Sequence, residues 1–188
     1  MSRPVDEINI KEVTNLKNEG LKGDFILSIP NVVPTGFKSS SLCKISNELF
    51  NTRLINYSIN KTNRFFHLLS NDSEMEAEPI RTLNLLNGKY LMKEVFNVPF
   101  YGDAMALGIE DIRLINTSRN ETHFLGTSSC FNVENENRVC SGLYNSKNKE
   151  IIVNCVFPSP TKSTCEKNWV FFNENEIIYN WFPISIYT

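Results

Sequence analysis

The sequence predicts an all-β protein, and three observations lead to this fold class. Short runs of β-branched and aromatic residues recur between turn residues from about residue 41 onward. The dipeptide Asn87-Gly88 separates two such runs and is the strongest two-residue hairpin signal in the chain. A strand-like segment that begins at Glu110 is followed 56 positions later by a similar one that begins at Glu166. No long helical pattern follows residue 22.

Length, composition and charge narrow the classes of function. With 188 residues and 41% apolar residues, the chain fits one ordinary domain with a sizeable core. The net charge of -2 and the pI near 5.8 provide no basic surface for nucleic acid. No run approaches the roughly 18 apolar residues of a membrane helix, and residues 2–7 lack the apolar core of a signal peptide. We therefore expect a cytoplasmic protein without a nucleic-acid or membrane partner.

The cysteines and histidines predict no cofactor and no metal site. There is no CxxC motif, and His67 and His123 are isolated from each other and from any cysteine pair. Two cysteine pairs are each ten residues apart, a spacing that disulfides use. The missing signal core favours free thiols in a reducing compartment over disulfides. The five cysteines are Cys43, Cys130, Cys140, Cys155 and Cys165.

In chain order, a polar N-terminal segment (1–22) precedes the β domain (23–188). The first segment has the apolar spacing of one short amphipathic helix. A first strand is expected at 25–30, before breaks at Pro30, Pro34 and Gly36. The next strands are expected at 41–45, 49–59, 65–69, 81–86 and 90–96, with an acidic surface loop at 71–78 and a hairpin joining the last two strands.

The second half of the chain continues the same pattern. After a loop at 99–103, prolines break the chain again at Pro158 and Pro160. The strands expected here are 108–115, 123–131, 138–144, 150–157, 166–172 and 176–182.

The internal repeat selects one architecture among sandwich, barrel and propeller. Aligning Glu110 with Glu166 also aligns Leu114 with Val170, and about four strands over roughly 55 residues lie between the two units, the size of a propeller blade. An earlier copy begins near Ser40. The repeat therefore predicts a partial five-bladed β-propeller with two complete four-stranded antiparallel blades and part of a third.

The order and spacing of three segments resemble the five-bladed propeller superfamily of glycoside hydrolases and β-mannoside phosphorylases. They especially resemble propeller domains attached to glycosyltransferases in large DNA viruses and some microbes. The resemblance covers about residues 24–188. Its segments are Glu110-Asp111-Ile112-Arg113, which opens the second blade, Glu166-Lys167-Asn168-Trp169, which opens the third, and 52–57, which forms the second strand of the first.

The resemblance implies a role for each matched position. Asp111 and Glu166 correspond to catalytic carboxylates, with Glu166 as the general acid that protonates the leaving oxygen. Glu110 corresponds to a carboxylate that binds sugar hydroxyls. Arg113 and Lys167 correspond to positions that hold phosphate. The substrate-binding set is completed by Arg53, Asn168 and Trp181, the last of these either as a sugar-stacking platform or as a core residue.

The chain also departs from the family pattern. Ser40 and Ser41 stand where the hydrolases keep a first-blade carboxylate, and glycoside cleavage normally needs two carboxylates. The resemblance thus implies a carbohydrate-binding or glycan-processing accessory protein of viral type without independent hydrolase activity. It also implies that the cytoplasm in question is that of a host cell or its virus factory. The alternatives are a glycosidase or glycoside phosphorylase completed by oligomerisation, and a truncated structural or interaction module.

Two further questions stay open on the sequence alone. Glu110, Asp111 and Arg113 form either a pocket for a glycan or sugar phosphate, or an ion-pair network that fastens neighbouring blades. An incomplete propeller leaves unpaired strand edges. We therefore expect either self-association or a partner chain that supplies the missing blades.

Overall fold

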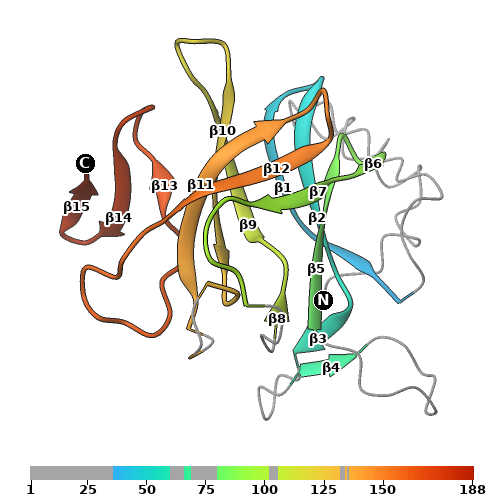
Figure 1. Cartoon of the computed structure of the whole chain (residues 1–188), viewed down its shortest axis with the longest axis horizontal. Coiled ribbons are helices and arrows are strands. Elements are labelled where there is room, and N and C mark those ends of the chain that lie inside the picture. Colours follow the sequence, from blue (N-terminus) through green and yellow to red (C-terminus); the bar gives the residue numbers. More distant parts are fainter. Residues whose placement is uncertain (1–35, 60–65, 69–79, 102–105, 132–133, 135) are drawn as a thin grey trace, which may run out of the picture.

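The computed structural model describes residues 36–59, 66–68, 80–101, 106–131, 134 and 136–188. Within these residues the chain is all-β and contains no helix, which confirms the predicted fold class (Figure 1). Fifteen strands form four sheets. The helix expected within residues 1–22, the strand expected at 25–30 and the loop expected at 71–78 lie outside the described residues.

The first sheet consists mainly of four antiparallel strands, each hydrogen-bonded to the next. Their order is β1 (Lys38–Ser46), β2 (Leu49–Ile55), β5 (Ile80–Leu86) and β6 (Tyr90–Leu91). A short strand, β8 (Ala106–Leu107), pairs with β5 in parallel.

The strand expected at 49–59 is divided in two by Asn56. The Asn56 side chain accepts a hydrogen bond from the Arg81 backbone N–H at 2.7 Å, so the side chain takes the place of a ladder contact. The chain beyond Asn56 forms β3 (Tyr57–Ile59), which pairs with β4 (Phe66–Leu68) in a separate hairpin.

The second sheet is an antiparallel meander extended by one parallel strand. The meander consists of β9 (Glu110–Asn116), β10 (Thr122–Ser128), β11 (Arg138–Asn145) and β12 (Glu150–Val156). The ends of these four strands lie within two residues of the predicted ends, except that β10 ends three residues earlier than predicted. On its outer side β12 pairs in parallel with β7 (Lys93–Phe96), as Figure 1 shows.

The Asn87-Gly88 turn is confirmed, but the long hairpin predicted around it is wrong beyond its first residues. Asn87 and Gly88 have φ angles of 53° and 64°, as a type I′ turn requires. Tyr90 and Leu91 pair with β5, and the Met92 N–H still donates to the Asn84 carbonyl at 2.8 Å. At Met92 the chain leaves the first sheet, because residues 93–96 find a backbone partner in β12, whose outer edge would otherwise be unpaired.

The third sheet is a smaller meander of β13 (Val170–Phe171), β14 (Ile177–Trp181) and β15 (Ile184–Tyr187). The prediction of a strand over 166–172 is wrong for most of that range, since Asn168 adopts a left-handed φ of 65°, which interrupts an extended strand. The third unit was predicted to hold two strands, and β15 is an additional one.

Two apolar clusters hold the sheets together. The larger lies between the first and second sheets and includes Leu86, Met92, Ile109, Phe124 and Tyr144. The smaller lies between the second and third sheets and consists of Leu125, Val139, Trp169 and Ile177. Neighbouring β10 residues thus serve different clusters, since successive side chains on a strand point to opposite faces.

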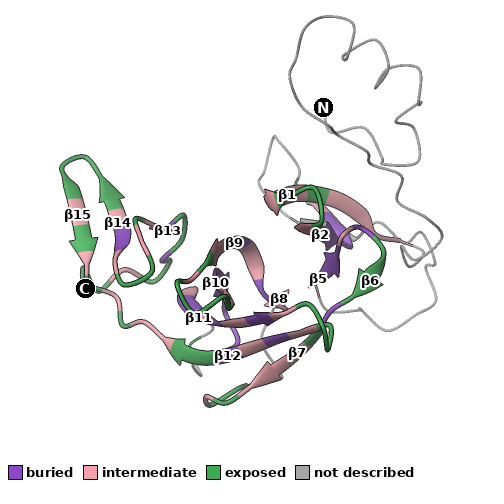
Figure 2. Cartoon of the chain, turned by 90° about the horizontal axis from the view of Figure 1, so that it is seen from above, coloured by how far each residue is buried: buried purple, intermediate pink, exposed green. Residues whose placement is uncertain are grey.

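The second sheet therefore lies between the other two. Its first strand, β9, contacts both β1 and β13. Figure 2 shows buried residues concentrated on β2, β5, β10 and β11, whereas the β14–β15 hairpin is largely exposed. All five cysteines are free thiols. Among the residues described, no helix is long and apolar enough to cross a membrane.

Candidate functional site

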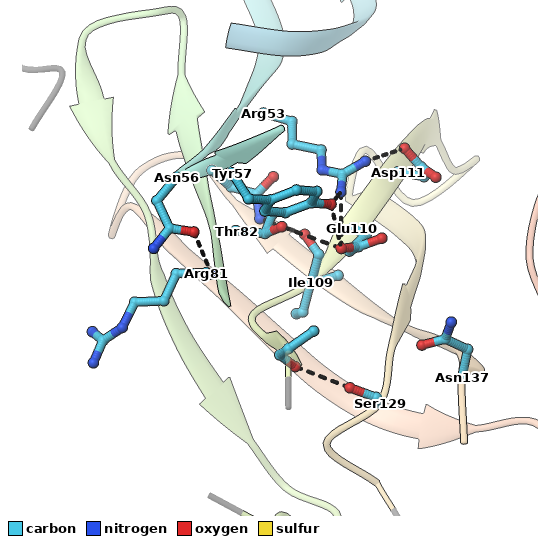
Figure 3. Close-up of polar contacts among 12 residues, drawn as sticks. Arg53, Asn56, Tyr57, Arg81, Thr82, Ile109, Glu110, Asp111, Ser129 and Asn137 are labelled. Carbon is cyan, nitrogen blue, oxygen red and sulfur yellow. Dashed lines mark hydrogen bonds and ion pairs between the residues drawn. The ribbon is translucent and has the colours of Figure 1, made fainter. Parts of the chain in front are cut away.

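The most distinctive polar cluster joins the first sheet to the second. Arg53 on β2 extends its side chain toward β9, where Nη2 lies 2.9 Å from Glu110 Oε1 and Nη1 lies 2.8 Å from Asp111 Oδ1 (Figure 3). The Arg53 side chain is only 10% exposed and each carboxylate 28% exposed. One guanidinium therefore holds two carboxylates in a largely desolvated setting, where such charge-assisted contacts are strong.

A β-bulge explains how two successive residues reach the same guanidinium. Neighbouring side chains on a regular strand point to opposite faces. Here the pairing register shifts between Leu125 and Thr127, which leaves one extra residue on β9, and Asp111 has a left-handed φ of 51°. The bulge turns the Asp111 carboxylate toward Arg53 beside that of Glu110. β1 carries a comparable irregularity between Ser39 and Ser41.

Tyr57 and Thr82 add further hydrogen-bonding groups to the cluster, while Arg53 Nε is buried without a hydrogen-bond partner among the described residues. The Tyr57 hydroxyl accepts a hydrogen bond from Arg53 Nη2 at 3.1 Å and donates to Glu110 Oε1 at 3.3 Å. The Thr82 hydroxyl lies 3.5 Å from the same Glu110 oxygen. Burial, helped by the charge of Glu110, raises the pKa of Tyr57 to about 12. Tyr57 therefore remains a neutral hydroxyl that donates to the carboxylate at physiological pH.

A pocket of about 300 Å³ lies beside the cluster and opens to solvent. Arg53 and Tyr57 form part of its wall and thus connect it to Glu110. Four hydroxyl groups, two cations and two isoleucines face the pocket. The lining residues are Lys38, Ser39, Ser40, Arg53, Ile55, Tyr57, Ser58 and Ile59.

Arg113, which was predicted to act with Glu110 and Asp111, is not their ion-pair partner. Its guanidinium makes a 3.4 Å contact with the Ile112 carbonyl and lies near Cys43 on β1. Burial raises the pKa of the Cys43 thiol, and the positive charge of Arg113 offsets part of that effect. Arg53, 58 residues before Asp111, provides the cation instead.

Glu166 lies in a different environment from the other predicted catalytic residue, Asp111. It is 8% exposed, and its carboxylate accepts hydrogen bonds from the hydroxyls of Ser159 and Thr161 and from the indole N–H of Trp169. All three donors are neutral and belong to the loop that leads into the third sheet. The carboxylate thus braces this loop.

The remaining predicted residues lie at the surface of the third unit. Lys167 and Asn168 are exposed, and Trp181 at the end of β14 is 50% exposed. The structure therefore brings together Arg53, Glu110 and Asp111. Among the described residues, no hydrogen bond or ion pair joins Arg113, Glu166, Lys167, Asn168 or Trp181 to that group.

The sequence did not indicate that Tyr57 and Thr82 belong to the cluster, nor that a pocket lies beside it. Tyr57 reaches Arg53 because the chain breaks at Asn56, and Thr82 comes from β5, which pairs with β2. The one sequence signal for Tyr57 was that it lies with Arg53 in the segment 52–57, which resembles the second strand of the first blade in the propeller family. Within the described part of the chain, no three His, Cys, Asp or Glu residues gather to hold a metal ion.

Comparison with known proteins identifies no matching family model, curated protein or solved structure.

Proposed function

We propose that this chain is a carbohydrate-binding module without hydrolase activity of its own, and that it holds a sugar in the pocket beside Arg53. The observation that carries the proposal is the composition of the pocket wall next to a fixed ion-pair cluster. Sugar hydroxyls both donate and accept hydrogen bonds, as do the three serine hydroxyls of the wall. Ile55 and Ile59 offer an apolar surface for the C–H face of a sugar ring.

The state of the carboxylates favours binding over cleavage. Glycoside hydrolysis uses two carboxyl groups on opposite sides of the bond, one of which must release a proton. Glu110 and Asp111 instead contact the same guanidinium, so they do not stand on opposite sides of a bond. Neither lines the pocket, and Glu166 is enclosed by its own loop. In the proposed role, the two carboxylates fix Arg53 so that the pocket wall is rigid before a ligand arrives.

We further propose that the first, second and third sheets are successive blades of a partial propeller. Two observations support this arrangement: the first strands β1, β9 and β13 follow one another through contacts of β9 with both neighbours, and β1 and β9 each carry a bulge. In a propeller, such first strands surround the central axis. The open edge of β15, with Ile184 and Ile186 exposed, is where an additional strand from another copy or a partner would pair. Sedimentation at increasing protein concentration tests this association.

A glycan array followed by NMR titration tests the sugar site. We expect neutral glycans to bind and to shift the signals of Tyr57 and Ser58. The variant Ser40→Leu places a larger apolar side chain in the pocket wall and should abolish binding, whereas Ser146→Leu is the control, since Ser146 is an exposed serine in the turn before β12 and does not line the pocket. Absence of any glycan binding, or equal loss in both variants, would refute the proposed site. Phosphate-dependent sugar release from a mannoside would refute the non-catalytic role.

A further inference from the structure

A second buried polar network joins the two larger sheets below the Arg53 cluster. The Tyr144 hydroxyl on β11 donates to Asn51 Oδ1 on β2 at 3.1 Å. Asn51 Nδ2 donates to Asn84 Oδ1 on β5 at 2.9 Å, and Asn84 Nδ2 donates to the Ile109 carbonyl at 2.8 Å. All four residues are buried. Because a buried amide without partners is costly, this chain of hydrogen bonds fixes the relative position of the strands that it connects.

Glu94 on β7 completes the network at its titratable end. Its Oε1 accepts a hydrogen bond from the Ile109 backbone N–H at 3.1 Å and lies 3.4 Å from Asn84 Nδ2. Glu94 and Asn84 therefore hold both backbone polar groups of Ile109. Ile109 is itself fully buried and directly precedes Glu110. The pair thus acts as a clamp on the residue that places Glu110 against Arg53.

No cation compensates the charge of Glu94 among the described residues. The titratable groups that sense its charge are the thiols of Cys130 and Cys140 from the second sheet. On the neighbouring strand β12, Glu150 is paired with Lys93 at 4.0 Å, and β9 contributes Glu110 and Asp111, which bind Arg53. Asn84 on β5 is neutral. Burial raises the pKa of Glu94 to about 7, although its two hydrogen-bond donors oppose the shift.

We propose that Glu94 is a positioning residue for the Arg53 cluster, and that gain of a proton by its carboxylate weakens the clamp on Ile109 and shifts Glu110 relative to Arg53 and Tyr57. Both contacts are hydrogen bonds donated to Glu94 Oε1, and an ionised carboxylate accepts such bonds more strongly than a neutral carboxylic acid does. The ion-pair cluster that borders the pocket therefore responds to pH through a residue that it does not contact.

NMR titration of the unliganded chain tests this inference, so its outcome does not depend on whether a sugar binds. We expect the Glu94 carboxyl, the Ile109 amide and the Arg53 Nε–H signals to titrate with one common midpoint at a pH of about 7. In Glu94→Gln the amide oxygen still accepts from Ile109, and the titration of Ile109 and Arg53 should vanish.

Glu150→Gln is the matched control, because Glu150 is a carboxylate on the strand beside β7 that lies outside the network. The Arg53 titration should persist in this variant. If Arg53 and Ile109 show no transition between pH of about 5 and about 8 in the unmodified chain, the inference is overturned, even if Glu94→Gln does not fold. A transition that remains unchanged in a folded Glu94→Gln protein would overturn it as well.

Discussion

The segments that open the second and third sheets have similar sequences and different surroundings. In both, a glutamate is followed shortly by a residue with left-handed φ, Asp111 at 51° and Asn168 at 65°. Glu110 and Asp111 bind a guanidinium from the preceding sheet. Glu166 binds only neutral donors within its own loop, and the adjacent Trp169 is buried in the apolar cluster between the second and third sheets.

The residue that faces each segment from the preceding sheet explains the difference. On β2, Arg53 pairs with Ser41, directly beside the β1 bulge. On β10, the corresponding position beside the β9 bulge is Leu125, which pairs with Arg113. Arg53 contacts the opening of the second sheet, and Leu125 shares a cluster with Trp169 at the opening of the third. The junction between the first and second sheets is therefore ionic, and the junction between the second and third sheets is apolar. Both are formed by the residue opposite the bulge in one sheet and by the opening segment of the next sheet.

The largest expected effect comes from the apolar junction. Trp169→Ala should lower the free energy of unfolding by about 3–5 kcal/mol, because it leaves a cavity beside the buried Leu125, Val139 and Ile177. Urea denaturation measures the loss. Trp181→Ala is the matched control, since Trp181 is half exposed, and should cost less than about 1 kcal/mol. Similar losses in both variants would mean that Trp169 does not anchor the third sheet.

Removing the cation from the ionic junction should have the next largest effect. Arg53→Met leaves Glu110 and Asp111 without their counter-charge and should cost about 2–3 kcal/mol, a value lowered from that of a fully buried pair because the carboxylates are partly exposed. Adding Glu110→Gln and Asp111→Asn should recover part of the loss in a double-mutant cycle. Arg113→Met is the control and should cost less than about 1 kcal/mol. No recovery in the cycle would argue against coupling across this junction.

The pH dependence of stability tests Glu94, whose hydrogen bonds support the ionic junction. The pKa of Glu94 is about 7 in the folded chain and near the ordinary value of 4.5 when unfolded, so the native state binds more protons between these values. The free energy of unfolding should therefore fall by about 3 kcal/mol as the pH rises from about 4.5 to about 8. Glu94→Gln should flatten this decline relative to the parent chain. An equal slope in parent and variant would contradict the assignment.

The smallest effect is expected for the glutamate of the third unit. Glu166→Gln keeps one acceptor oxygen but loses part of its hydrogen bonding to Ser159, Thr161 and Trp169. The change in the free energy of unfolding should be about 1 kcal/mol or less. Glu110→Gln should cost more because it also removes an ion pair. If thermal unfolding ranks the two variants in the opposite order, the contrast between the junctions fails.

Local features were predictable from sequence, and contacts between distant segments were not. The Asn87-Gly88 turn follows from backbone preferences of two residues, and the meander strands follow from runs of β-forming residues. The pairing of β7 with β12 depends on a strand that begins 57 positions later than β7 and leaves no local signal.

The candidate site shows the same limit. The sequence pointed to Glu110 and Asp111 as a charged group inside a strand, which is costly unless paired. It predicted Arg113 as the nearby cation, on proximity in sequence. The β9 bulge and the register of β2 determine that Arg53 is the partner instead. Neither the bulge nor the register is encoded in the spacing of the charged residues.

The parallel pairing of β7 with β12 has a consequence for the order in which the chain acquires its structure. During synthesis, residues 93–96 emerge directly after the first sheet, but their backbone partner at residues 150–153 emerges only when the whole meander between them has been made. Pairings between such distant segments are slow to form, because a long loop must close first. We therefore expect the β7–β12 pairing to be among the last backbone contacts of the second sheet to form, after the β9–β12 meander.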